Sequence, residues 1–198
     1  MATPRRSTTK RCFKLHVELE GVTPPIWRNI WVEGQMSFIQ LHHIIQAAMG
    51  WTDAHLHQFT ISDTRYATPD PEDDPEHPVV DERAVKLRDV LQGDLEFTYL
   101  YDFGDGWRHQ VSVEQVEPMK EPEGYAYVTD GDRACPPEDC GGAGGYQEFL
   151  DELAAKPKSK TVKEFLTWAG HDFKPERFDR HAANATLLRM AWNRWGER

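Results

Sequence analysis

Histidine and aspartate residues lie near the ends of two segments in which apolar and polar residues alternate, as they do in β-strands. These residues are His55, His57, Asp102, Asp105 and His109. Side chains two apart on a strand point the same way, so each histidine is in phase with an apolar strand face. A partly buried His–Asp pair can act as a general base, and neutral imidazoles can ligate a metal ion. The alternative is that these groups only bond neighbouring polar atoms at the edge of the core.

A cysteine pair, Cys135 and Cys140, is separated by four residues. Zinc sites usually combine two short pairs of cysteine or histidine, so a zinc ion here would need further ligands such as His55, His57 or His109. Zinc is therefore the cofactor that we consider. The other interpretation is a rigid loop with thiols packed beneath it. The spacing is not C-x-x-C, and thioredoxin-like chemistry has little support.

Four glycines and one alanine follow the cysteines, in residues 141–145. Backbone amides before a helix can cradle an anion. However, no Gly-Lys-Ser/Thr sequence follows, and no strand leads into a spaced dinucleotide-binding fingerprint. We interpret this segment as a flexible or tightly turned connector.

The first half of the chain predicts the elements that would position these groups. Residues 13–19 and 26–32 alternate as strands, and residues 38–49 have helical spacing between an N-cap at Ser37 and a stop at Gly50. Residues 55–61 predict a third strand. This ββαβ order is that of a β-grasp-like half, with the helix across a small sheet.

The second half predicts a long β-hairpin and then helices. Strands at 95–101 and 107–116 flank the turn signal Asp105-Gly106. Residues 69–78 predict an exposed acidic loop, residues 117–145 a loop, and residues 146–155, 161–169 and 179–195 helices. The fold class expected is α+β with a small mixed sheet, as one domain over residues 13–198 after a disordered basic tail at 1–12.

Charge and composition limit the partners. Five of the 23 basic residues and none of the 33 acidic residues lie in the first 14 positions. The acidic remainder would repel a phosphate backbone, so we expect nucleic-acid contact only through residues 1–14. No apolar run is long enough for a membrane span. Three cysteines without a signal peptide indicate thiols and a cytoplasmic location.

Three separated motifs resemble the plasmid pRiA4b Orf-3-like family. They lie at residues 41–59 (beginning LHHIIQAAMGW and ending HLHQF), 101–109 (YDFGDGWRH) and 135–146 (beginning CPPEDCGG), and PPIWR at 24–28 fits the family's opening hairpin. The resemblance spans roughly residues 13 to 180. It implies an α+β fold and an association with plasmids and mobile elements, and some members carry a resolvase-like label. It supplies no catalytic residues.

Three functions remain open. The first is a non-enzymatic binding or accessory module with a protein or small-molecule partner. The second is a metal-dependent hydrolase that uses His55, His57, Asp102 or His109 with Cys135 or Cys140. The third is nucleic-acid binding through the basic tail.

Overall fold

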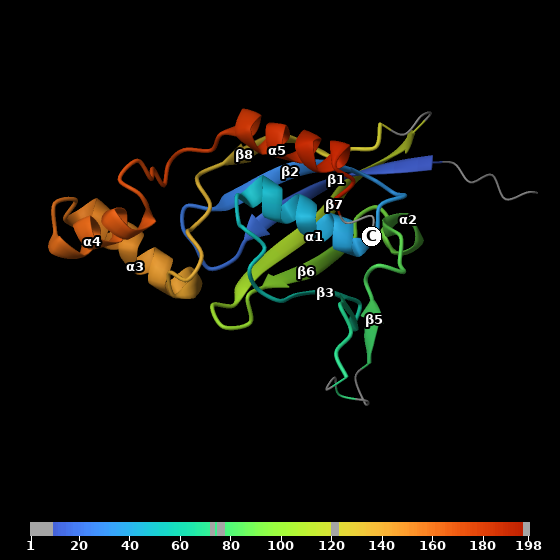
Figure 1. Cartoon of the computed structure of the whole chain (residues 1–198), viewed down its shortest axis with the longest axis horizontal. Helices are drawn as coiled ribbons and strands as arrows, with labels where there is room; N and C mark the ends of the chain where they lie inside the picture. The colour runs from blue at the N-terminus through green and yellow to red at the C-terminus, as the bar shows by residue number, and fades with distance from the viewer. Residues whose placement is uncertain (1–9, 72–73, 75–77, 120–122, 196–198) are drawn as a thin grey trace, which may run out of the picture.

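One mixed sheet of eight strands forms the body of the protein (Figure 1). The computed structural model describes residues 10–71, 74, 78–119 and 123–195. The strands are β1 (Lys10–Leu19), β2 (Ile26–Glu33), β3 (His57–Ile61), β4 (Thr64–Ala67), β5 (Val79–Asp81), β6 (Glu96–Tyr101), β7 (Trp107–Met119) and β8 (Tyr127–Asp132). Their order is β5-β4-β3-β6-β7-β1-β2-β8. The β4–β5 pair is parallel and the other pairs are antiparallel.

Helix α1 (Phe38–Met49) lies across this sheet (Figure 1). Its first turn is capped because Gln40 Oε1 accepts a hydrogen bond from the Ser37 backbone N–H at 2.9 Å. It ends at Gly50, whose φ of 102° allows its N–H to return to the Gln46 carbonyl. Phe38, Leu41 and Ile45 are fully buried on its inner face. The helix begins and ends where the sequence predicted, so the prediction is confirmed.

The sheet confirms an α+β fold but not the β-grasp-like opening. Strand β1 lies between β2 and β7, and its inward side chains Phe13, Leu15 and Val17 are fully buried. Strand β3 does not join this pair, because β6 and β7 stand between it and β1. The mixed sheet is therefore larger than expected.

Several elements differ from the prediction. Strand β8 lies in a segment predicted as a loop, strands β4 and β5 flank the predicted acidic loop, and α3 begins at Gly142 inside the glycine segment. Strand β8 contains Asp130, Gly131 and Asp132, which have low strand propensity, and pairs with the edge of β2. Pairing with a distant strand outweighs local preference there. Strand β1 already begins at Lys10, within the expected tail, whereas residues 1–9 lie outside the described residues.

The described residues contain four further helices: α2 (Leu87–Val90), α3 (Gly142–Ala155), α4 (Lys160–Ala169) and α5 (Arg180–Trp192). Helices α3 and α4 lie beyond one end of the sheet, and α5 runs beside β8 and α1 (Figure 1). Asn184 anchors α5 because its amide accepts from the Val128 N–H at 2.7 Å and donates to the Val128 carbonyl at 2.9 Å. Within the described part of the chain, no helix is long and apolar enough to cross a membrane.

Candidate metal centre

The three sequence motifs meet at one end of the sheet. Trp51 Nε1 of the first motif donates to the Pro136 carbonyl of the third at 2.9 Å. The Glu138 carboxylate of the third accepts from the Thr52 backbone N–H at 3.2 Å and from the Tyr101 hydroxyl of the second motif. Segments that are distant in sequence therefore build one region of the molecule.

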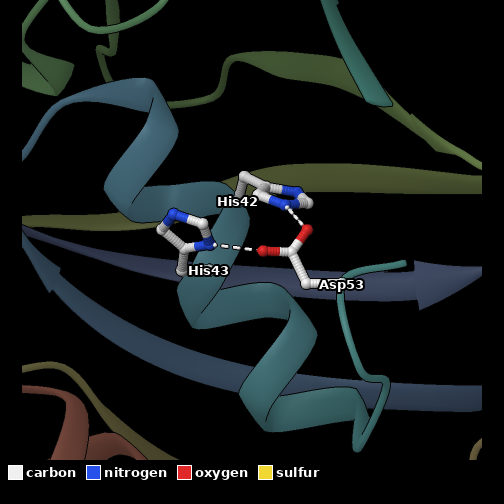
Figure 2. A group of neighbouring side chains, drawn as sticks. All are labelled: His42, His43 and Asp53. Carbon is white, nitrogen blue, oxygen red and sulfur yellow. Dashed lines mark hydrogen bonds and ion pairs between the residues drawn. The ribbon is translucent and has the colours of Figure 1, made fainter. Parts of the chain in front are cut away.

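Two histidines of α1 converge on one carboxylate in this region (Figure 2). His42 Nε2 lies 2.6 Å from Asp53 Oδ1, and His43 Nδ1 lies 3.0 Å from Asp53 Oδ2. Asp53 stands just after α1 with a φ of 60°, and its backbone N–H donates to Gln46 Oε1 at 3.1 Å. The helix end and this loop thus hold the carboxylate between the two imidazoles.

A buried hydrogen-bond chain fixes the proton on His42. An ionised carboxylate only accepts hydrogen bonds, so His42 Nε2 carries the proton that faces Asp53. The Tyr99 hydroxyl, 2.8 Å from His42 Nδ1, therefore donates to that nitrogen and accepts from Gln46 Nε2 at 2.9 Å. Both ring nitrogens of His42 therefore have a hydrogen-bond partner, and these bonds hold the ring in one orientation.

A second imidazole supports the His42 ring from its face. The rings of His42 and His57 are stacked with centroids 3.4 Å apart and an interplanar angle of 4°. His57 Nε2 lies 2.8 Å from Oε2 of Glu82, a fully buried residue, and Thr68 Oγ1 donates to Glu82 Oε1 at 2.9 Å. Predicted residue His57 therefore takes a supporting position behind the cluster.

The protonation state of the cluster suits a metal ion. Burial lowers the pKa of His42 to about 4, although its hydrogen bond to Asp53 opposes this shift. Burial also lowers the pKa of His43. Burial, the largest single influence, pushes the pKa of Asp53 upward, but the hydrogen bond from His42 and the charge interactions with the neighbouring histidines together outweigh it, and the net pKa lies below its ordinary value. Neutral imidazoles and an ionised carboxylate are the forms that coordinate metals.

A cavity of about 200 Å³ opens beside the cluster. His43 and Asp53 line it together with Trp51, Met190 and Trp195. The Trp195 ring meets the His43 ring edge-on, with centroids 6.0 Å apart, and Trp195 is 57% exposed. An ion or small ligand can therefore reach the two outer members of the cluster.

The residues fit a divalent transition metal. One donor atom from each of His42, His43 and Asp53 lies within 4.8 Å of the other two. Ligands about 2.1 Å from a tetrahedral zinc ion are roughly 3.4 Å apart, so small side-chain movements are sufficient. Two imidazoles and one carboxylate with a free position form a ligand set of catalytic zinc sites.

Metal binding has a cost in the network behind His42. A metal on Nε2 moves the ring proton to Nδ1, and the Tyr99 hydroxyl then loses its acceptor. An unsatisfied buried hydroxyl costs about 1–3 kcal/mol. The free energy of metal coordination must exceed this cost for an ion to bind.

The other predicted residues lie in different places. His55 and Asp102 are neighbours, with 3.7 Å between His55 Nε2 and Asp102 Oδ2. Asp105 instead accepts a hydrogen bond from the Gly141 backbone N–H at 3.3 Å. His109 is fully buried in edge contact with the Trp51 ring, and among the described residues neither of its ring nitrogens has a hydrogen-bond partner.

The cysteines do not join a metal centre in the described part of the chain, where the groups of convergent donors contain only histidine and aspartate. Cys135 and Cys140 are free and partly buried. Burial raises the pKa of the Cys140 thiol to about 12 and raises that of Cys135 further. Without a bound metal ion, both side chains are therefore thiols at neutral pH.

The burial of His109 predicts a loss of stability in acid. Desolvation lowers its folded-state pKa from 6.5 to about 4, so the unfolded chain binds this proton first as the pH falls. Stability should decline between pH 6.5 and 4, by about 3 kcal/mol from this residue alone. Urea unfolding across this range should show a shallower decline in His109→Leu. The exposed control His171→Leu should keep the wild-type profile, and an unchanged profile in His109→Leu would refute this assignment.

The sequence analysis missed His42, His43, Asp53, Glu82 and Tyr99. One signal was available: His42 lies four residues after Phe38 and three before Ile45, so helical spacing places it on the buried face of α1. A buried histidine needs polar partners, and this one finds Asp53 and Tyr99. Which partners it finds depends on the tertiary fold.

Comparison with known proteins agrees with the resemblance seen in the motifs. The family described as plasmid pRiA4b ORF-3-like protein matches residues 11–182. The uncharacterised protein y4hQ of Sinorhizobium fredii (strain NBRC 101917 / NGR234) is 39% identical over 182 residues, covering 90% of this chain and 89% of the relative.

A solved structure shares the fold. The protein of unknown function MM3350 from Methanosarcina mazei Go1 has a TM-score of 0.77 and 36% sequence identity, covering 88% of this chain and 98% of that chain. The residues matched by the family span all three motifs. The chain therefore belongs to the plasmid pRiA4b ORF-3-like family.

Proposed function

We propose that this protein is a metal-binding module that holds a zinc-like divalent ion at His42, His43 and Asp53. The observation that carries the proposal is one carboxylate that faces two imidazoles at 2.6 and 3.0 Å beside an accessible cavity. The proposal develops the first hypothesis from the sequence, a non-enzymatic binding module, by naming a metal ion as what the module binds. It moves the metal from the cysteines to α1 and the loop that follows it.

The ion class follows from the donors. Imidazole nitrogen suits zinc, copper, iron and nickel, whereas calcium and magnesium prefer sites made only of oxygen. With a metal on Nε2, the His42 Nδ1–H would face the Tyr99 hydroxyl oxygen, which would then accept the outer hydrogen bond that orients a metal-bound histidine. Zinc, which has no preferred geometry of its own, is the simplest occupant.

A metal-dependent hydrolase is the second candidate, and the cavity favours it. Three protein ligands leave a coordination position for water, whose pKa a zinc ion lowers to about 7. The small size of the cavity, about 200 Å³, favours a small substrate or the end of a larger one. Zinc-loaded protein should then hydrolyse p-nitrophenyl acetate or phosphate, and His43→Ala should not.

Calorimetric titration with zinc tests the metal site. His43→Ala should bind one equivalent of zinc less than the wild type, because it removes a ligand. His43 is only partly buried, so the variant should still fold. The matched control His171→Ala removes an exposed histidine outside the cluster and should bind zinc as the wild type does. Equal zinc stoichiometry and affinity in His43→Ala and the wild type would rule the centre out.

A further inference from the structure

We propose that His55, Asp102 and Asp139 form a second divalent-metal site, independent of the centre at α1. The three residues come from distant segments: the residues before β3, the turn between β6 and β7, and the cysteine-containing loop. One donor atom from each lies within 4.8 Å of the others. The site joins the three sequence motifs a second time, at residues that the first centre does not use.

The distances are those of ligands around a shared ion. His55 Nε2 lies 3.4 Å from Asp139 Oδ1 and 3.7 Å from Asp102 Oδ2. This nitrogen is buried and, among the described residues, makes no hydrogen bond. Donors bound about 2.1 Å from one tetrahedral ion are roughly 3.4 Å apart, which matches these separations. A metal ion supplies the partner that the nitrogen lacks.

The turn between β6 and β7 orients the Asp102 carboxylate for this role. Its Oδ1 accepts hydrogen bonds from the backbone N–H groups of Gly104 at 2.9 Å and Asp105 at 3.3 Å. Its own N–H donates to the Leu56 carbonyl at 2.8 Å, which ties the turn to the segment of His55. One carboxylate oxygen thus holds the turn, and Oδ2 remains for the ion.

The cysteine-containing loop delivers the third donor. Asp139 has a φ of 59°, and the loop after it is clamped to the same turn by the bond from the Gly141 N–H to Asp105 Oδ2. The Asp139 side chain is 71% exposed, so the site opens to solvent. An ion can enter there and keep water molecules in its remaining positions.

The donor set separates this site from the first centre. Two carboxylates can neutralise a divalent ion, and one imidazole adds nitrogen to a mainly oxygen environment. Carboxylate and water ligands suit manganese, whereas two imidazoles and one carboxylate suit zinc better. We therefore expect Mn²⁺ to favour the His55–Asp102–Asp139 site.

Titration of the full chain with Mn²⁺, with free Mn²⁺ counted by electron paramagnetic resonance, tests the inference. The wild type should bind one Mn²⁺ at this site, and His55→Ala and Asp139→Asn should each weaken binding by about 10-fold or more. Asp139 is exposed and asparagine tolerates positive φ, so this variant keeps the fold. The control Asp63→Asn replaces an exposed aspartate with a φ of 65° that is not part of this cluster, and it should bind Mn²⁺ as the wild type does.

Asp53→Asn separates the two sites. It should keep Mn²⁺ binding and weaken zinc binding strongly at the first centre, so failure of one site does not imply failure of the other. Absence of Mn²⁺ binding in the wild type would overturn the inference. So would affinities in His55→Ala and Asp139→Asn equal to that of the wild type.

Discussion

Asp53→Asn is expected to weaken zinc binding strongly at the α1 centre while leaving the fold intact. Asp53 supplies the only charge of the three ligands and bonds both imidazoles, at 2.6 and 3.0 Å. Its φ of 60° is a conformation that asparagine adopts more readily than most residues, so the backbone is preserved. His43 can move its proton to the other ring nitrogen and accept a hydrogen bond from the new amide. The substitution therefore removes charge rather than packing.

The expected loss of zinc affinity is on the order of 100-fold or more, because changes to outer-shell partners alone cost 10–100-fold. Calorimetric zinc titration and thermal unfolding should be measured on the same samples. Asp63→Asn is the matched control, since Asp63 is exposed and has a φ of 65°. Wild-type zinc affinity in Asp53→Asn would show that the carboxylate is not a ligand.

Gly142→Ala is expected to lower the free energy of unfolding by about 3 kcal/mol. Gly142 has a φ of 68°, which costs an alanine roughly 1–2 kcal/mol. An added Cβ would also lie 2.3 Å from the Asp105 backbone oxygen, so the clamped loop and the turn must separate. Overpacking of this kind costs a further 1–3 kcal/mol.

Gly144→Ala provides a control of opposite sign in the same helix. A Cβ at Gly144 meets no atom within 4 Å, and alanine is the better helix former by roughly 0.5–1 kcal/mol. The free energy of unfolding measured in urea should therefore be equal to or higher than that of the wild type for Gly144→Ala, and well below it for Gly142→Ala. Equal stability of the two variants would contradict the close approach of the loop to the turn.

Local patterns predicted the elements whose stability is encoded nearby. The alternation of apolar and polar residues in β1, and the helical spacing of apolar residues between the caps of α1, each lie within one short segment. Both elements appear as predicted. Strand β8 was missed because Asp130 and Gly131 do not favour a strand by themselves, and pairing with β2 holds them in one. The β-grasp-like arrangement was not confirmed, because strand order depends on pairing between distant segments.

The candidate sites show the same division. His55 and Asp102 were grouped as candidates for one polar site from their positions at strand ends, although strand phase alone does not show proximity, and the fold places them 3.7 Å apart. The sequence did not indicate a role for Asp53. It is a loop residue with positive φ, so no helical or strand periodicity predicts which side chains it faces. His42 could have been identified from its helical phase, but its bond to Tyr99 joins residues 57 positions apart.

Metal content is the most direct test of the His42–His43–Asp53 centre. Untagged wild-type protein, purified without chelator and dialysed against zinc and then metal-free buffer, should retain zinc by elemental analysis. The variant His43→Ala should retain about one equivalent less per chain. A thiol reagent should react with Cys135 and Cys140 equally with and without zinc, because neither cysteine is a ligand. Folded wild-type protein that retains no zinc, or zinc that protects the cysteines instead, would contradict the proposed centre.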